Sequence, residues 1–402
     1  MVKFVLVAYG SRGDVEPSAA VGAELLRRGH EVQMAVSPHM LDFVWSAGLS
    51  AVAYGPDLQG LLHDENFLRN LSAKMHNPIS ILPEVIEHAN RVCAEKVATL
   101  TSLTEGADVI VASTAEQGIA AIVGEHQDIP WAGLHPFPAR IWSSNGLYSH
   151  ITNTAENNQR RALGLPDSAE ASTLSAVEPA ALEIQAYEKF CLPKAAADWV
   201  EPNHRHPFIG TLTLEAPTDC DEDVLSWIAA GPPPIYFGFG STPVTSFQIT
   251  VATISAACSQ LGERALICSG PNDSADVPES DYVKIVGAIN HSAVLPACGA
   301  VVHHGGSGTT AATLRAGIPM LILWLWLDQP VWAAAAEELE VGFGRRFSDT
   351  TVDSLVADLR VILTPHYASQ AREVAARMTA PAHSVATAAD LVEEVARVGR
   401  ST

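Results

Sequence analysis

Positive charge is scarce in this sequence. Its 402 residues include 24 Lys and Arg against 45 Asp and Glu, which gives a net charge of −21 at pH 7. No basic run is longer than the arginine pair in L-R-R-G-H at residues 26–30. Proteins that bind a nucleic-acid backbone use clustered Lys and Arg, so this composition excludes nucleic acid as the expected partner. An anionic ligand has to be held by backbone amides, histidines or a few isolated cations.

Paired cysteines and long apolar runs are missing as well. The six cysteines show no C-x-x-C spacing, which is typical of buried thiols in a reducing compartment. The apolar run that opens the chain ends at Gly10, too early for a secretory signal. The longest later run, at 316–327, falls short of the roughly 20 residues that a membrane span needs. We therefore expect a cytoplasmic protein without a transmembrane segment.

Two common nucleotide-binding signatures are absent. The turn at residues 9–14 lacks the G-x-G-x-x-G spacing, which disfavours a nicotinamide-dependent dehydrogenase. The glycine-rich stretch at 303–310 lacks the lysine of a P-loop. No stretch has the residue spacing of a metal site, so we expect no metal ion.

What the sequence does contain is a repeated alternation of apolar strands and helices. The chain is 48% hydrophobic, and its length predicts about two to three domains. Apolar strands separated by helices indicate parallel sheets covered on both faces, so the expected class is α/β. The alternation breaks at an acidic loop near 214–223 and restarts after the three prolines at 232–234. We predict Rossmann-like βαβ domains at 1–212 and 231–380, a linker at 213–230, and a helix at 381–402 that packs back on the first domain.

A hydroxyl and a carboxylate lie in the turn after the first predicted strand. Ser11 and Asp14 follow that strand at its carboxyl end, where open α/β sheets bind ligands. In a functional interpretation, Asp14 takes a proton from an acceptor hydroxyl, directly or through Ser11. In a structural one, both residues cap a helix that begins near Pro17 at its first position. Both interpretations stand on the sequence alone.

The stretch V-V-H-H-G-G-S-G-T-T at 301–310 is the strongest anion-binding pattern. It predicts a strand, a glycine turn without obstructing side chains, and a helix whose first amides and dipole favour negative charge. Adjacent strand residues point to opposite faces, so one of His303 and His304 is expected to face a ligand while the other packs. A metal held by both is not expected. The alternative is a plain glycine-rich turn.

Three weaker patterns follow other predicted strands. Gly240 and Ser241 end the first strand of the second domain, where a glycine lets backbone approach a ligand. Ile289 lies between a strand and a helix and offers its backbone to a nucleobase edge. His135 ends a first-domain strand and is a candidate for lining an acceptor pocket.

A carboxylate and an amide stand side by side at Asp328 and Gln329. Such a pair suits the vicinal hydroxyls of a sugar, and the alternative is that Asp328 caps the following helix.

The order of these stretches resembles one enzyme family. The matching pieces are G-S-R-G-D-V-E-P at 10–17, G-P-P-P-I-Y-F-G-F-G-S at 231–241, V-G-A-I-N-H at 286–291, V-V-H-H-G-G-S-G-T-T-A-A-T-L-R-A-G-I-P at 301–319 and D-Q-P-V-W-A-A at 328–334. Together they resemble the family 1 glycosyltransferases of GT-B fold. The actinobacterial branch that acts on glycopeptide antibiotics and mycobacterial glycopeptidolipids, related to sterol glucosyltransferases, is the most similar. The resemblance covers nearly the whole chain except 141–210.

This resemblance implies two Rossmann-like domains that face each other across a cleft. The first binds an acceptor and the second a nucleotide sugar. The implied reaction is an inverting transfer of a hexose from a UDP- or dTDP-sugar to a hydroxyl of a lipid, peptide or natural product, without metal or other cofactor. A bulky Trp326 or Leu327, if it faces the sugar, favours a 6-deoxyhexose.

The resemblance also assigns roles to residues. Asp14, with Ser11, is the implied base, and Ile289 presents its backbone to the nucleobase. The implied diphosphate and sugar contacts are Gly240, Ser241, His303, Gly306, Ser307, Gly308, Thr309, Asp328 and Gln329.

Two other functions fit the same scaffold. A nucleotide-sugar 2-epimerase needs no acceptor, and a non-catalytic nucleotide-sugar binding protein turns nothing over.

Overall fold

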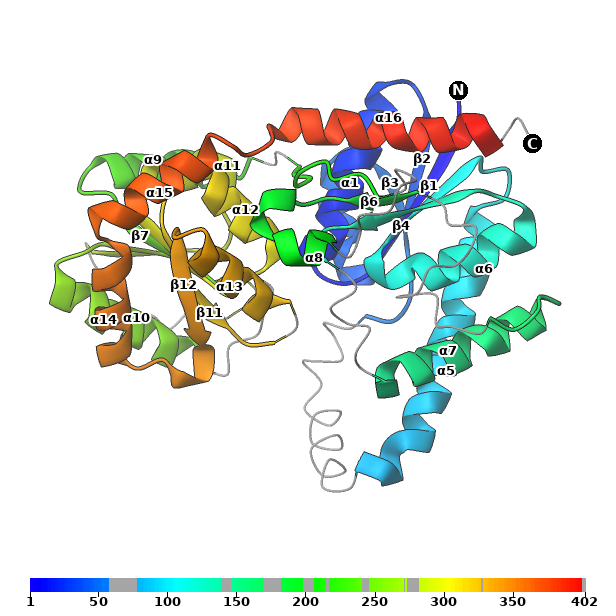
Figure 1. Ribbon diagram of the computed structural model, residues 1–402, viewed down its shortest axis with the longest axis horizontal. Coiled ribbons are helices and arrows are strands. Elements are labelled where there is room, and N and C mark those ends of the chain that lie inside the picture. Colours follow the sequence, from blue (N-terminus) through cyan, green and yellow to red (C-terminus); the bar gives the residue numbers. More distant parts are fainter. Residues whose placement is uncertain are drawn as a thin grey trace. The chain divides into compact units, whose positions relative to one another are not determined.

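The computed structural model resolves the chain into two compact units (Figure 1). The first comprises residues 1–187, 193–214 and 380–402, and the second comprises 188–192 and 215–379. The structure describes residues 1–57, 78–138, 146–168, 182–197, 206–214, 217–240, 246–270, 272, 282–326 and 328–399.

The first unit is built on a parallel six-stranded sheet with the order β3-β2-β1-β4-β5-β6. Its strands are β1 (Lys3–Ala8), β2 (Glu31–Val36), β3 (Ser50–Ala53), β4 (Val109–Ser113), β5 (Trp131–His135) and β6 (Glu183–Gln185). Its helices are α1 (Arg12–Arg27), α2 (Leu41–Ser46), α5 (Pro78–Leu103), α6 (Gln117–Gln127), α7 (Gly146–Ala162), α8 (Pro193–Ala197) and α16 (Pro381–Gly399), with 3₁₀ turns η1 (Pro38–Met40) and η2 (Thr114–Glu116).

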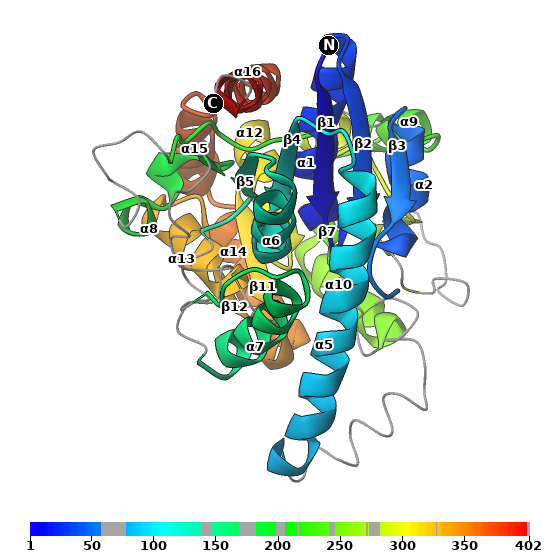
Figure 2. The same ribbon diagram turned by 90° about the vertical axis from the view of Figure 1, so that its right-hand side faces the viewer.

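Both faces of this sheet are covered, as the apolar strands predict. Phe4 and Leu6 of β1 pack on one side, in a core shared with α1 and α16. Val5 and Val7 pack on the other side, in a core shared with α5 and α6. Alternate strand residues point to opposite faces, so a strand that is apolar throughout needs a helical layer on each side. Figure 2 shows α5 and α6 in front of this sheet.

The second unit repeats the arrangement with the order β12-β11-β10-β7-β8-β9, again all parallel. Its strands are β7 (Ile235–Gly238), β8 (Ala265–Cys268), β9 (Val283–Val286), β10 (Ala300–His303), β11 (Met320–Trp324) and β12 (Gly342–Arg346). Its helices are α9 (Asp221–Ala229), α10 (Phe247–Leu261), α11 (His291–Val294), α12 (Ser307–Ala316), α13 (Gln329–Glu338), α14 (Val352–Ile362) and α15 (Pro365–Ala375), with 3₁₀ turns η4 (Lys189–Cys191), η5 (Leu295–Ala297) and η6 (Phe347–Asp349).

The two sheets have the same topology. Numbered within each unit, the strands of both follow the order 3-2-1-4-5-6. The order reverses between β1 and β4 in the first unit and between β7 and β10 in the second. In sheets of this kind, ligands bind outside the carboxyl ends of the strands at that reversal. A ligand is therefore expected near the turns after β1 and β10 and the segments after β4 and β7.

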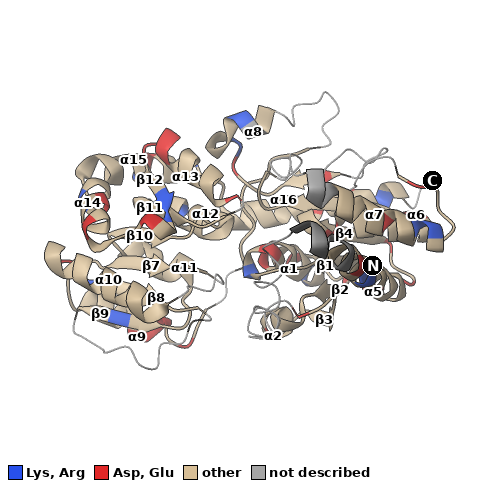
Figure 3. Cartoon of the chain, turned by 90° about the horizontal axis from the view of Figure 1, so that it is seen from below, with Lys and Arg blue, Asp and Glu red and all other residues tan. Residues whose placement is uncertain are grey.

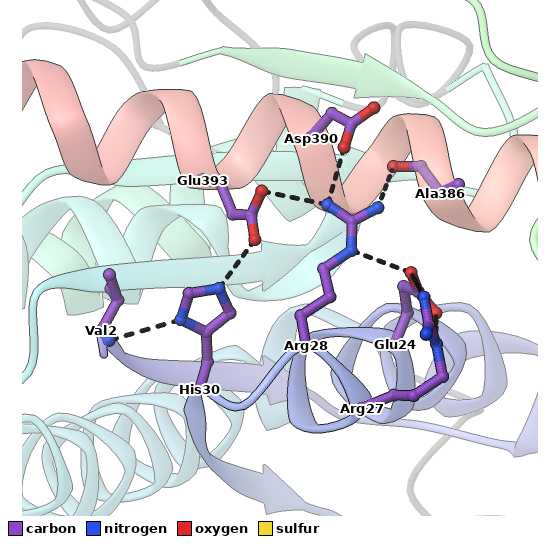
Figure 4. Close-up of polar contacts among 8 residues, drawn as sticks. All are labelled: Val2, Glu24, Arg27, Arg28, His30, Ala386, Asp390 and Glu393. Atoms are coloured by element: carbon purple, nitrogen blue, oxygen red, sulfur yellow. Dashed lines mark hydrogen bonds and ion pairs between the residues drawn. The ribbon is translucent and has the colours of Figure 1, made fainter.

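The helix α16 packs against α1 in the first unit through an ionic network (Figure 4). The Arg28 guanidinium contacts Asp390 at 2.6 Å and Glu393 at 3.0 Å on α16, and Glu24 at 2.8 Å on its own helix. Glu393 also contacts the His30 ring at 2.7 Å. Hydrogen bonds from Arg27 and Arg28 lower the pKa of Glu24 to about 2. The end of the chain is thereby fixed to the outer face of α1.

The structure differs from three sequence expectations. Helix α1 begins at Arg12, so Pro17 lies inside it rather than at its first position. The earlier start has a local cause, because the Asp14 carboxylate accepts the Ser11 N–H and caps the helix one turn before the proline. The segment 188–192, expected in the first domain, belongs to the second unit. Helix α9, in the region expected to be a linker, packs into the core of the second unit.

Candidate functional site

The turn after β1 is folded around the Asp14 carboxylate. Oδ2 of Asp14 accepts the Ser11 N–H at 2.7 Å and the Ser11 hydroxyl at 3.0 Å. Gly10 has φ +136°, and a Cβ at this position would overlap the Asp14 carboxylate. The Gly10 N–H donates to Oγ of Ser37, which follows β2, at 2.7 Å. The carboxylate is therefore held at the point where the strand order reverses.

The environment of Asp14 raises the pKa of its carboxyl group. Burial raises the pKa of Asp14, the two hydrogen bonds from Ser11 lower it, and the nearby Glu116 raises it, with a net upward shift. Asp14 is nevertheless only half-buried and keeps contact with solvent. A carboxylate with a raised pKa is a stronger base once it is ionised. The capping geometry is thus present, and the role of Asp14 as a base stays a prediction.

A buried ion pair beside this turn was not foreseen from the sequence. Nζ of Lys96, on α5, lies 2.7 Å from Oε1 of Glu116, and the Tyr54 hydroxyl donates to Oε2 of Glu116 at 2.7 Å. The Lys96 ammonium also stands 3.5 Å from the centre of the Tyr9 ring. Glu116 follows β4, the other strand at the reversal of strand order. Its place after that strand is the sequence feature that could have marked it as a candidate site residue. The pair brings opposite charges to the side of the turn that holds Asp14.

His135 lies at the carboxyl end of β5 but is buried, with 2% of its surface exposed. Its Nε2 lies 3.0 Å from Nε2 of Gln117 and 3.7 Å from the Glu183 carboxylate. The side chain therefore packs inside the first unit and does not line an open surface in this structure. The acceptor-pocket contact expected of His135 stays a prediction.

The two histidines at the end of β10, His303 in the strand and His304 directly after it, are placed differently. His303 is fully buried, and its Nδ1 accepts the Gly305 N–H at 3.1 Å, so the ring proton of the neutral form lies on Nε2. His304 is partly exposed, and its ring packs between the backbones of Gly240 and Gly306. A Cβ at Gly240 would come within 2.7 Å of the His304 ring, and one at Gly306 within 2.6 Å. His303 is therefore the histidine that packs in the core, and its implied contact with a diphosphate stays a prediction.

Both rings are neutral at pH 7. Burial, with the neighbouring His304 and His291, lowers the pKa of His303 well below its usual value. Burial also lowers the pKa of His304 to about 4. A neutral imidazole donates a hydrogen bond without carrying a charge into the site.

The glycine turn leads into the N-terminus of α12. The first-turn amides of a helix lack an intrahelical acceptor, and here they belong to Ser307, Gly308 and Thr309. Gly308 is exposed, and a Cβ at this position would meet no atom within 4 Å. Gly305 has φ +93°, and a Cβ there would meet Ile322 at 2.8 Å. The turn is thus packed on its inner side and open at Gly308.

The loop between β11 and α13 is braced by Asp328 and Gln329. Oε1 of Gln329 accepts the N–H groups of Leu325 at 2.7 Å and Trp326 at 3.2 Å. Oδ2 of Asp328 accepts the Trp332 indole N–H at 2.9 Å rather than capping α13. The Trp326 side chain is 50% exposed, and Leu327 lies outside the described residues.

The remaining predicted residues lie along the same edge of the second sheet. Gly240 follows β7 with φ +61°, and Ser241 lies outside the described residues. Ile289 follows β9, two strands from β7 and therefore roughly 10 Å along the edge. Its side chain is buried, so only its backbone is available to a ligand. The structure brings Gly240, His304 and Gly306 into contact and places Ile289 farther along the edge.

Three features of the described parts of the chain limit the class of ligand. No group of three or more His, Cys, Asp and Glu side chains there is arranged to hold a metal ion. None of the helices in those parts has the length and apolar character needed to cross a bilayer. Basic residues are scattered over both units in Figure 3 rather than gathered on one face.

Comparisons with known proteins agree with this geometry. Residues 4–139 match the glycosyltransferase family 28 N-terminal domain, and residues 266–396 match the C-terminal domain of proteins like the erythromycin biosynthesis protein CIII. An uncharacterised glycosyltransferase of Mycobacterium tuberculosis is 51% identical over 99% of this chain and 100% of its own. The vancomycin aglycone glucosyltransferase of Amycolatopsis orientalis is 27% identical over 96% of both chains. A solved structure of a Streptomyces glycosyltransferase with thymidine diphosphate has a TM-score of 0.67 at 21% identity, covering 98% of this chain and 100% of its own.

Proposed function

This chain belongs to the family 1 glycosyltransferases of GT-B fold, and we propose that it moves a hexose from a UDP- or dTDP-sugar to a hydroxyl of a lipid, peptide or natural-product acceptor, with inversion at the sugar carbon. The family is supported by the 51% identical glycosyltransferase and by both domain matches. The nucleotide is suggested by the thymidine diphosphate bound to the structurally similar Streptomyces enzyme.

The observation that carries the proposal is the cradle formed by Gly240, His304, Gly306 and the first turn of α12. Glycines let a diphosphate approach the backbone, and the α12 amides and dipole stabilise its charge. That charge grows as the bond between the sugar and the diphosphate breaks. A preorganised donor aimed at such a charge contributes roughly 10²- to 10³-fold in rate.

Asp14 is the proposed general base, with Ser11 orienting its carboxylate. The acceptor oxygen attacks the anomeric carbon and gives its proton to Asp14, while the bond to the diphosphate oxygen breaks and the electron pair leaves with the nucleotide. One displacement inverts the configuration of the carbon. The raised pKa of Asp14 suits this proton transfer, which is worth roughly 10²- to 10⁴-fold.

The remaining proposed contacts belong to the donor. Ile289 presents its backbone to the nucleobase, and Ser307, Gly308 and Thr309 present their amides to the diphosphate. Asp328 and Gln329 hold the sugar. The half-exposed Trp326 beside them favours a less polar sugar such as a 6-deoxyhexose. We propose no metal, so chelation is expected to leave the activity unchanged.

The test is a donor and acceptor panel with product analysis. The protein is incubated with UDP-glucose, dTDP-glucose and dTDP-rhamnose, each with sterol, peptide and lipid hydroxyl acceptors and each without acceptor. The proposal expects a glycoside of inverted configuration that forms only with an acceptor. An isomerised nucleotide sugar in the acceptor-free arm would instead indicate a 2-epimerase. Nucleotide binding with no product in any arm would indicate a binding protein.

A further inference from the structure

The short segment 287–290, between β9 and α11, is held from two sides. The Cys220 thiol donates to the carbonyl of Ala288 at 2.9 Å, and the Cys268 thiol donates to that of Gly287 at 3.3 Å. Ile289 packs in the core that includes Val224 and Ile228 of α9. Thiols are weak donors, so these bonds alone do not fix the backbone strongly.

The strong anchor is Asp221, the first residue of α9. Its Oδ1 accepts the N–H of Asn290 at 2.9 Å and the hydroxyl of Thr218 at 2.6 Å, and its Oδ2 accepts the N–H of Thr218 at 2.8 Å. Only 8% of the residue is exposed. Asn290 in turn caps α11, since its Oδ1 accepts the N–H of Ser292 at 3.2 Å. Asp221 therefore joins two helix starts across the segment that contains Ile289.

The charge of Asp221 is directed at this segment. Burial alone raises its pKa, but the hydrogen bonds from Asn290 and Thr218 outweigh that effect, so the pKa lies below its usual value. The neighbouring acidic residue Asp223 behaves differently, because it is largely exposed and pairs with Lys284 at 2.6 Å. The first turn of α9 thus contains two carboxylates. That of Asp221 is buried and hydrogen-bonded to the segment, and that of Asp223 is exposed and is not.

We propose that Asp221 is a positioning residue for nucleobase recognition, which holds the backbone of residues 287–289 in the conformation that meets the base. The inference rests on the proposed function, in which the Ile289 backbone reads the base. Asp221 itself touches neither the donor nor the reacting atoms. Its effect belongs to nucleotide affinity and to discrimination between bases rather than to the chemical step.

The experiment compares Asp221→Ala and Asp221→Asn with the control Asp223→Asn on the same helix. Calorimetric titration measures the Kd of UDP and dTDP, and inorganic pyrophosphate serves as a probe of the α12 cradle alone. Loss of the Asn290 hydrogen bond is expected to weaken the preferred nucleotide about tenfold and to reduce the ratio between UDP and dTDP affinities. Pyrophosphate affinity, and turnover at saturating donor, are expected to stay within about twofold of the parent, as is every value for Asp223→Asn.

The outcomes separate this inference from the function beneath it. Unchanged nucleotide affinity in a folded Asp221→Asn variant, or an equal loss for nucleotide and pyrophosphate, overturns the positioning role. If Asp221→Ala fails to fold, the milder Thr218→Val removes the hydroxyl that donates to the Asp221 carboxylate. The same outcomes then apply to that variant. A parent protein that binds neither UDP nor dTDP overturns the proposed function itself, whatever the Asp221 variants do.

Discussion

The two sheets share one strand order, yet the carboxyl-end edges of their strands carry different chemistry. The edge of the first unit holds titratable groups: Asp14 with a raised pKa, and the buried pair of Lys96 and Glu116. The edge of the second holds glycines and two neutral histidines beside a helix start. A shared topology therefore fixes where a ligand binds but not what is done to it. One edge is suited to taking a proton and the other to holding an anion.

The two edges obtain their charge from different groups, and each has a different requirement. In the first unit, the buried charges of Lys96 and Glu116 lose their hydration and depend on one another. In the second, backbone amides supply the positive character, and glycines are needed because side chains would fill the space. The comparison predicts that substitutions of charged residues in the first unit alter rate or stability through charge, whereas substitutions of glycines in the second act through shape and affinity.

The largest expected effect is that of Asp14→Asn on turnover. The amide cannot take the acceptor proton, so kcat is expected to fall by roughly 10²- to 10⁴-fold. The affinity for UDP or dTDP, which the second unit provides, is expected to be unchanged in calorimetric titration. The control Asp42→Asn removes an exposed carboxylate from α2 and is expected to leave both quantities alone. A variant with full turnover would remove Asp14 from the role of base.

The next effect is on stability, and it probes the buried pair. Lys96→Met leaves the Glu116 carboxylate without its cation, and the free energy of unfolding is expected to fall by about 3–5 kcal/mol in urea titrations. The double variant Lys96→Met with Glu116→Gln removes both charges and is expected to recover most of that loss. If the single and double variants are equally unstable, the loss is one of packing rather than of charge.

The sequence predicts the sheets and the two turns well, because both depend on local patterns. Apolar strands, glycines and the 301–310 stretch are readable without the fold. The Lys96–Glu116 pair cannot be predicted from the sequence, since it joins α5 to the 3₁₀ turn η2 that follows β4, and only the packing shows that the two residues meet. Alternation requires that one histidine at the end of β10 packs, but which one depends on the neighbouring β7 and α12, and in the structure it is His303 that is buried.

The third prediction concerns acid sensitivity of the second unit. The folded-state pKa of His304, about 4, lies below the 6.5 of an unperturbed histidine, so the unfolded chain binds the proton more readily. Its contribution to stability is therefore complete above about pH 6.5 and is lost as the pH falls toward 4. His304→Gln is expected to lose roughly 2 kcal/mol less than the parent between pH 6.5 and pH 4.5 in urea titrations. The exposed His383→Gln serves as the control and is expected to follow the parent.

The smallest expected effect is that of Gly308→Ala, which is predicted to change nucleotide affinity without lowering stability. Gly308→Ala adds a methyl group that meets no protein atom within 4 Å, at a helical position where alanine is favoured over glycine. The melting temperature is therefore expected to stay the same or rise slightly. The same methyl group stands where a diphosphate would approach the first-turn amides, so affinity for UDP or dTDP is expected to fall about tenfold.

Gly306→Ala is the matched opposite of that change. Its Cβ would lie 2.6 Å from Nε2 of His304, so the ring must move, and both stability and nucleotide affinity are expected to fall. If Gly308→Ala binds nucleotide as well as the parent does, the space beside α12 is not where the phosphates lie. Anion binding at the edge of the second sheet would then be contradicted. The Asp14 and Lys96 results would still describe the charged edge of the first sheet.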